Sequence, residues 1–142
     1  MITVVLDTNI VVSAFLNEDG LEAAVLDLAL NRRLSLILSE PILDEYTRVL
    51  HRRKLGLDPK KINHALTQIR HIARMVKPTK AVSASKDDPD NRFLECAEAS
   101  SADFLVTGNT RHFPKEWKTT SVVTARQLIE GIVLNLRREK DM

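Results

Sequence analysis

The chain has 142 residues, of which 44% are hydrophobic and 28% charged, the size and composition of one soluble globular domain. Its 21 Lys and Arg residues against 19 Asp and Glu give a net charge of +2, which excludes a strongly basic nucleic-acid binder and an acidic tail protein. The single cysteine, Cys96, excludes an internal disulfide and cysteine-cluster zinc sites. The sequence shows neither a signal peptide nor a membrane-length apolar run, so we expect a soluble, cytoplasmic protein.

Short apolar runs alternate with amphipathic stretches in the first part of the chain. Residues 2–6 form a short, β-branched and mainly apolar run, which is typical of a strand buried on both faces, and residues 34–38 read as a second short strand. The spacing of apolar residues predicts helices over residues 10–16 and 21–31. Ser39 stands at an N-cap position with a proline in the first turn, so a further helix follows it.

The middle of the chain contains two Asp-Pro pairs that each predict a helix start. In the pair at residues 58–59, the Asp is the cap and the Pro takes the first helical position. Residues 74–77, at the end of that apolar stripe, fit either a strand or a last helical turn. Residues 79–87 are expected to be irregular. The pair at 88–89 repeats the pattern, and we expect Asp88 to be the cap.

The last part of the chain continues the alternation. Residues 102–107 and 121–123 read as strands, and Thr124 with Gln127 forms a capping box for a final helix. Alternating strands and helices predict an α/β domain with a mainly parallel sheet and helices on both faces. In such folds the ligand site lies beyond the carboxyl ends of the strands.

The domain is expected to cover residues 1–137 as a single unit, and residues 138–142 are expected to form a polar, frayed C-terminal tail.

Oxygen-bearing side chains stand where the predicted strands end. Asp7 follows the first strand, and Asn109 follows residues 102–107. Glu45 lies early in the helix after the second strand, and Asp90 lies in the first turn of its helix. We expect no histidine or thiol beside them, and an all-oxygen set suits Mg²⁺ or Mn²⁺ rather than zinc. Hydrolysis of a phosphate ester is the chemistry that best matches such a site.

Each of these residues also has a purely structural interpretation. Asp7 fits a helix cap, and Asp90 fits a first-turn acid that favours the helix dipole. Glu45 fits a solvated charge on a surface helix, and Asn109 fits a turn. Their common placement at strand ends favours a shared site.

Four motifs in this order resemble the PIN-domain family, in particular the toxin components of toxin–antitoxin systems. They are VVLDTN at residues 4–9, LSEPILDEY at 38–46, DPDNRFLECA at 88–97 and ADFLVTGN at 102–109. The resemblance runs from residue 2 to about residue 137. It implies a three-layer α/β/α sandwich with a mainly parallel central sheet, and a metal-dependent ribonuclease that leaves a 5′-phosphate and a 3′-hydroxyl.

The resemblance also implies site roles and partners. Asp7, Glu45 and Asp90 match the acids that hold Mg²⁺ or Mn²⁺. Asn109 stands at a catalytic position where many members have a fourth acid, and the missing charge weakens a second metal position. Polar positions that support the metal site in other family members are matched here by Asn9, Ser39 and Thr107. The implied partners are RNA, a cognate antitoxin and a second copy of the chain.

Basic residues near the acids are candidates for contacts with RNA phosphates. Arg92 and Arg111 flank the acids and are preferred, while Arg48 continues along the helix of Glu45. The basic residues between Lys60 and Arg74 read as a solvated helix face. Aromatic residues make up 4% of the chain and do not alternate with the basic residues, so no base-stacking surface is predicted.

Other functions fit the sequence less well. An aspartyl-phosphate phosphatase would need a second acid two residues after Asp7, where Asn9 stands. A dinucleotide-binding enzyme would need a GxGxxG motif after the first strand, and the sequence has none. A receiver domain does not match acids as widely spaced as Asp7, Glu45 and Asp90. The remaining alternative is a PIN-fold module that binds RNA or protein without cutting, and Asn109 favours it.

Overall fold

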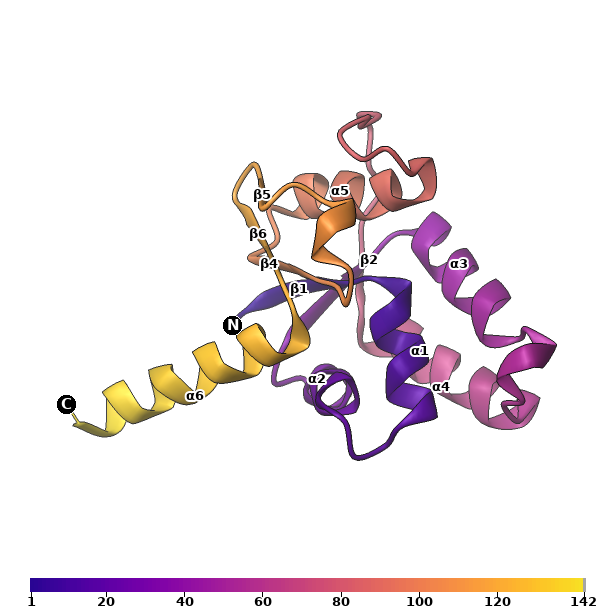
Figure 1. Cartoon of the computed structure of the whole chain (residues 1–142), viewed down its shortest axis with the longest axis horizontal. Helices are drawn as coiled ribbons and strands as arrows, with labels where there is room; N and C mark the ends of the chain where they lie inside the picture. The colour runs from indigo at the N-terminus through magenta and orange to yellow at the C-terminus, as the bar shows by residue number, and fades with distance from the viewer. Residues whose placement is uncertain (142) are drawn as a thin grey trace.

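The computed structural model describes residues 1–141 and shows a six-stranded sheet with the order β3-β2-β1-β4-β6-β5 (Figure 1). Neighbouring strands are parallel except β5 and β6, so the predicted mainly parallel sheet is confirmed. The strands are β1 (Thr3–Leu6), β2 (Ser35–Leu38), β3 (Arg74–Met75), β4 (Phe104–Val106), β5 (Glu116–Trp117) and β6 (Thr120–Val123). The helices are α1 (Thr8–Leu16), α2 (Leu21–Leu30), α3 (Glu40–Leu50), α4 (Pro59–Ile72), α5 (Asp88–Ser100) and α6 (Ala125–Asp141), with short 3-10 turns η1 (Arg53–Leu55) and η2 (Thr110–His112).

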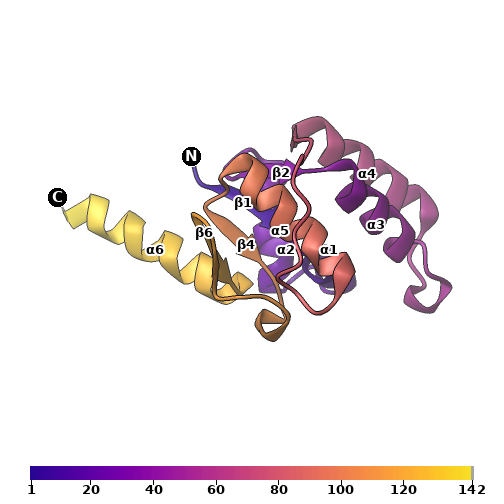
Figure 2. The same cartoon turned by 90° about the horizontal axis from the view of Figure 1, so that it is seen from above.

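Helices cover both faces of the sheet. Helix α5 packs on β1, β2 and β4, while α1, α2 and the start of α6 lie on the opposite face (Figures 1 and 2). Val4, Val5 and Leu6 of β1 are completely buried, and Val5 pairs with Leu105 of β4. Because each central strand is enclosed from both sides, its sequence is continuously apolar rather than alternating. The three-layer α/β/α sandwich is confirmed.

Hydrogen bonds hold the residues that follow the strands in register. The Asp7 N–H donates to the Val106 carbonyl at 2.9 Å, and the Thr107 N–H donates to the Val123 carbonyl at 2.9 Å. The parallel ladder therefore continues one residue beyond β1 and β4. This brings Asp7 and Thr107 side by side at the carboxyl edge of the sheet.

Two further predictions can be compared with the structure. Residues 74–77, which fitted a strand or a helix end, contain β3, and β3 pairs in parallel with β2. The capping box of α6 is confirmed: the Gln127 N–H donates to Thr124 Oγ1 at 3.1 Å, and the Thr124 N–H donates to Gln127 Oε1 at 2.9 Å.

Three details differ from the predictions. Asp88 does not cap α5, because the N-cap is Asp87 and Asp88 is the first helical residue. Strand β5 was not predicted, since its two residues are too few for a periodicity and it forms an antiparallel hairpin with β6. Residues 138–141, expected to form a polar tail, continue α6 in the structure, and Met142 lies outside the described residues.

Between residues 1 and 141, no helix has both the length and the apolar character needed to cross a membrane.

Candidate metal centre

Asp7 is a buried carboxylate held by Thr107, the residue that follows the neighbouring strand β4. Its residue is only 7% exposed, and its Oδ2 accepts a hydrogen bond from Thr107 Oγ1 at 2.7 Å. Asp7 occupies the N-cap position of α1, but its side chain makes no capping hydrogen bond. The purely structural interpretation of Asp7 therefore does not describe its carboxylate, which is directed to Thr107 instead.

The surroundings of Asp7 favour its protonated form. Burial raises the pKa of Asp7 to about 6, the Thr107 hydrogen bond opposes this, and the charges of Asp90 and Glu45 raise the pKa further. These influences show that the three predicted acids lie near enough to repel one another. A cation bound among them would offset both the desolvation and the repulsion.

Glu45 is brought to the site by a hydrogen bond between two helices. Thr8 Oγ1, in the first turn of α1, donates to Glu45 Oε2. The Glu45 side chain is 21% exposed, and Arg48 Nη2 lies 3.9 Å from its Oε1. Glu45 is therefore a positioned carboxylate and not a freely solvated charge on α3.

Asp90 lies in the first turn of α5 with one oxygen atom that lacks a hydrogen bond. Its side chain is 14% exposed, and its Oδ2 is buried without a hydrogen-bond partner among the described residues. His112 Nδ1 lies 3.3 Å from that oxygen, at ion-pair distance. Burial and the charge of Asp87 raise the pKa of Asp90, and His112 opposes them. A buried carboxylate oxygen without a donor is the feature that a cation would satisfy.

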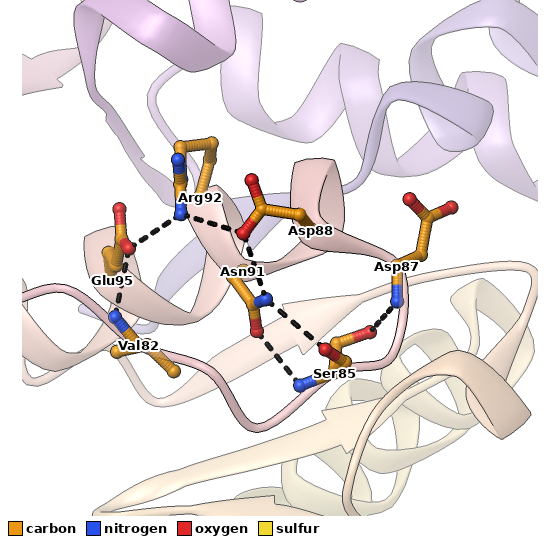
Figure 3. A network of polar contacts seen from close by, with 7 residues as sticks. All are labelled: Val82, Ser85, Asp87, Asp88, Asn91, Arg92 and Glu95. Atoms are coloured by element: carbon orange, nitrogen blue, oxygen red, sulfur yellow. Dashed lines mark hydrogen bonds and ion pairs between the residues drawn. The ribbon is translucent and has the colours of Figure 1, made fainter.

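The segment before α5 is held by a network around a buried amide (Figure 3). Asn91 Oδ1 accepts from the Ser85 N–H at 2.8 Å, and Asn91 Nδ2 donates to the Ser85 carbonyl at 3.2 Å. Glu95 Oε2 accepts from the Val82 N–H at 2.9 Å. These bonds fix the irregular residues to α5 and so determine where the first turn, with Asp90, begins.

The predicted supporting residues occupy different positions around the site. Thr107 contacts Asp7 directly, and its Oγ1 also accepts from the Asn109 N–H at 3.0 Å. Asn9 Oδ1 accepts from the Gly108 N–H at 3.1 Å, which anchors the loop after β4. Ser39 is buried at the end of β2, but its side chain interacts with the Cys96 thiol. Ser39 is the N-cap of α3 without a side-chain capping bond.

Asn109 contacts a histidine that the sequence interpretation left out of the site. Asn109 Nδ2 lies 3.0 Å from His112 Nε2, while His112 Nδ1 faces Asp90. The expectation that no histidine accompanies the acids is therefore wrong. The signal was local: His112 follows Asn109 by three residues, within reach once Thr110–His112 forms a turn.

The two predicted RNA-contacting arginines differ in their surroundings. Arg92 Nη2 lies 2.9 Å from Glu95 Oε2 and 3.4 Å from Asp88 Oδ1 (Figure 3). Arg111 is exposed and makes no ion pair within residues 1–141. Helices α3 and α5 also enclose a cleft of about 350 Å³, lined by Glu45, Arg48 and Arg92 among others.

The donor atoms fit a divalent cation, although the three predicted acids are not arranged as one tight cluster. Within residues 1–141, the group whose potential ligand atoms all lie within 4.8 Å of one another is Asp87, Asp90 and His112. Asp7 and Glu45 are not members of this group, but the charges of Glu45 and Asp90 act on Asp7 and the charge of Glu45 acts on Asp90. Carboxylate oxygens are suitable ligands for Mg²⁺ and Mn²⁺.

Comparisons with known proteins identify the family and the fold of the chain. A PIN domain family model matches residues 3–111. An uncharacterised protein of Methanocaldococcus jannaschii, MJ1680, is 30% identical over 112 residues, which cover 76% of this chain and 71% of that protein. The structure of VapBC2 from Rickettsia felis, bound to a DNA fragment from their promoter, has a TM-score of 0.57 at 15% identity and covers 87% of this chain and 98% of that chain.

The T. brucei RRP44 PIN domain has a TM-score of 0.55 at 14% identity and covers 99% of this chain and 86% of that chain. At these identities the two solved structures show a common fold. Together with the match over most of the sequence, they show that the chain belongs to the PIN-domain family and has its nuclease-type fold.

Proposed function

We propose that this protein is a metal-dependent endoribonuclease. The observation that carries the proposal is that Asp7, Glu45 and Asp90 come from three elements to one edge of the sheet. There the charges of Asp90 and Glu45 raise the pKa of Asp7, and the charge of Glu45 raises the pKa of Asp90. Keeping such a group ionised without a cation is unfavourable. A structural role would require neither the burial of Asp7 nor the unsatisfied oxygen of Asp90.

The proposed roles follow from the contacts. Asp7, Glu45 and Asp90 hold Mg²⁺ or Mn²⁺, which, when bound, lowers the pKa of a water for attack on an RNA phosphodiester. Thr107 and Thr8 orient two of the carboxylates, so that these oxygens are fixed before a ligand arrives. Asn9 supports the loop that carries Asn109.

We propose that RNA follows the cleft between α3 and α5. Arg48 on one wall is exposed, with a side chain 63% accessible, and is directed to water as well as to Glu45. Arg92 on the opposite wall and Arg111 beyond Asp90 supply further positive charge for phosphates. Local charges of this kind make RNA binding compatible with a net charge of only +2.

The direct test is cleavage of a labelled RNA with Mg²⁺ or Mn²⁺ and with a chelator. Cleavage is expected with either ion, and it is expected to be absent with the chelator and in Asp7→Asn. Asp27→Asn, which changes an exposed acid on α2, is the matched control and should retain full activity. Full activity in Asp7→Asn would overturn the proposal.

A second candidate function is a PIN-fold module that binds RNA or protein without cutting. Asn109, which stands where many members have a fourth acid, is the observation in its favour. Saturable Mn²⁺ binding that is lost in Asp90→Asn supports the enzyme, whereas RNA binding without any cation site supports the module.

We also propose a role as the toxin of a toxin–antitoxin pair in the cytoplasm. A solved structure with the same fold is described as VapBC2 bound to promoter DNA, and the single cysteine, Cys96, is a buried free thiol. The test is growth on induction, with and without the product of the adjacent reading frame. Growth arrest that this product relieves, and that Asp7→Asn lacks, is the expected result; normal growth would contradict the toxin role.

Self-association is proposed from the outer part of α6, which projects away from the sheet (Figure 1). Val133, Leu134 and Leu136 are 41%, 54% and 60% exposed on this helix. Burying such side chains is favourable by roughly 1.5–3 kcal/mol each, so a second copy is a suitable occupant.

An antiparallel pair of α6 helices would bring the exposed Val133, Leu134 and Leu136 of two copies together. Sedimentation analysis should show a dimer that Leu136→Lys converts to monomer. An unchanged dimer in that variant, or a monomeric wild type, would contradict this interface.

A further inference from the structure

His112 lies beside the candidate metal centre, and none of the roles described above uses it. It ends the turn η2, which follows β4, and its Nδ1 lies 3.3 Å from the buried Asp90 Oδ2. Asp87, directly before α5, completes a group whose potential ligand atoms all lie within 4.8 Å of one another. Three separate backbone positions thus direct one nitrogen and two carboxylates to a common point.

The contact between His112 and Asp90 leaves the carboxylate oxygen unsatisfied. Asp90 Oδ2 is buried, and the 3.3 Å contact with His112 Nδ1 is its one polar side-chain contact among the described residues. Half of the His112 side chain is exposed, so the imidazole is not placed there by core packing. A cation between Nδ1 and Oδ2 would provide the partner that this oxygen lacks.

The other face of the imidazole has a partner that can select its tautomer. His112 Nε2 lies 3.0 Å from the side-chain amide of Asn109. The atom placed there is the amide nitrogen Nδ2. A 180° turn of the amide, which exchanges its nitrogen and oxygen, puts Oδ1 in this place, where it accepts from Nε2–H and leaves the Nδ1 lone pair free for a metal. Histidine ligands in proteins usually have such a partner at their second ring nitrogen.

We propose that His112 Nδ1 is a ligand of the divalent cation held at Asp90, and that Asn109 is the positioning residue that orients the imidazole. This inference rests on the proposed metal-dependent function. It gives Asn109 a role although it carries no charge: the ligand in place of the missing acid is supplied three residues later, by His112. A nitrogen donor favours Mn²⁺ and later transition metals relative to Mg²⁺, which prefers oxygen.

The test is electron spin-echo modulation of Mn²⁺ bound to the full chain, because this signal reports nitrogen ligands independently of activity. The wild type and the control His71→Gln, which changes an exposed histidine on α4, should both show nitrogen modulation. His112→Gln should lose the modulation and bind Mn²⁺ roughly 10- to 100-fold more weakly. Isotopic labelling of histidine with ¹⁵N should change the modulation frequencies.

The outcomes separate this inference from the proposed function. Saturable Mn²⁺ binding without nitrogen modulation, or modulation that persists in His112→Gln, overturns the histidine ligand and leaves the nuclease proposal intact. Absence of any saturable Mn²⁺ binding overturns both.

Metal preference gives a second measurement with the same protein. His112→Asp restores an all-oxygen set, and the ratio of Mn²⁺ affinity to Mg²⁺ affinity is expected to fall roughly tenfold. An unchanged ratio in His112→Asp would contradict ligation by nitrogen.

Discussion

The carboxylates of Asp7 and Asp90, two of the proposed metal ligands, are held in different ways. Asp7 is fixed by the sheet and accepts a short hydrogen bond from the buried Thr107. Asp90 lies at a helix start, and its Oδ2 has no donor. The protein therefore orients the Asp7 carboxylate through its own hydrogen bond, whereas Asp90 Oδ2 would gain a partner when a cation binds.

The largest expected effect comes from removing the charge of Asp7. Asp7→Asn should reduce metal-dependent RNA cleavage by about 100-fold or more, since several kcal/mol of transition-state stabilisation are attributed to the metal. Single-turnover cleavage at saturating Mn²⁺ measures the loss. Activity within a few-fold of wild type would show that Asp7 is not a ligand.

The same substitution should stabilise the metal-free fold. The pKa of Asp7 is raised from 3.8 to about 6, so the folded state binds the proton more tightly, and stability falls as the pH rises between these values. At pH 7 the whole cost is present, on the order of 3 kcal/mol. Urea unfolding with chelator should therefore show Asp7→Asn more stable than wild type at pH 7 and equal to it near pH 3. Equal stability at both pH values would contradict the raised pKa.

Metal binding should follow the ionisation of the same carboxylate. Mn²⁺ affinity is expected to rise as the pH increases through about 6, because the ligand must lose its proton first. Calorimetric titrations between pH 5 and pH 8 measure this dependence. An affinity that does not change over this range would show that Asp7 is already ionised at the lowest pH.

Removing the donor to Asp7 should have a smaller effect. Thr107→Val keeps the shape of a fully buried side chain but removes the hydroxyl that also accepts from the Asn109 N–H. The loss of a buried hydrogen bond costs roughly 1–3 kcal/mol. Mn²⁺ affinity should fall about 10-fold, while Thr110→Val, an exposed change in the same loop, should leave it unaltered.

The smallest expected effects concern the two arginines. Arg111→Gln should reduce the salt dependence of RNA binding by about 0.7 in the log–log slope, the value for one phosphate contact on a single strand. Arg92→Gln should reduce the slope less, because Glu95 and Asp88 already neutralise this side chain. Equal reductions would show that RNA displaces these carboxylates from Arg92.

Much of the fold could be predicted because parallel strands that are buried on both faces have apolar sequences. Residues 4–6 and 36–38 are continuously apolar where the structure encloses β1 and β2 from both faces. Strand β5 could not be predicted, because it depends on pairing with β6 and not on its own two residues. The Asp88 cap was misplaced by one residue, a shift that depends on the network around Asn91.

The candidate site, like the fold, could be predicted only in part. Asp7 and Thr107 could be predicted because each directly follows a strand. The backbone hydrogen bonds between the parallel strands then place the two residues side by side. The bond from Thr8 to Glu45 joins residues 37 positions apart, and no spacing in the sequence specifies it. His112 was left out because the turn that directs it to Asp90 is irregular, and a turn of three residues has no periodicity to detect.

The central claim is that Asp7, Glu45 and Asp90 hold one divalent cation at the carboxyl edge of the sheet. Mn²⁺ titration of the full chain at pH 7.5, followed by the signal of free Mn²⁺ in electron paramagnetic resonance, tests it most directly. The account predicts saturable binding in the wild type and in Asp27→Asn, and its loss in both Asp7→Asn and Asp90→Asn. Undiminished Mn²⁺ binding in either of the last two variants would contradict it.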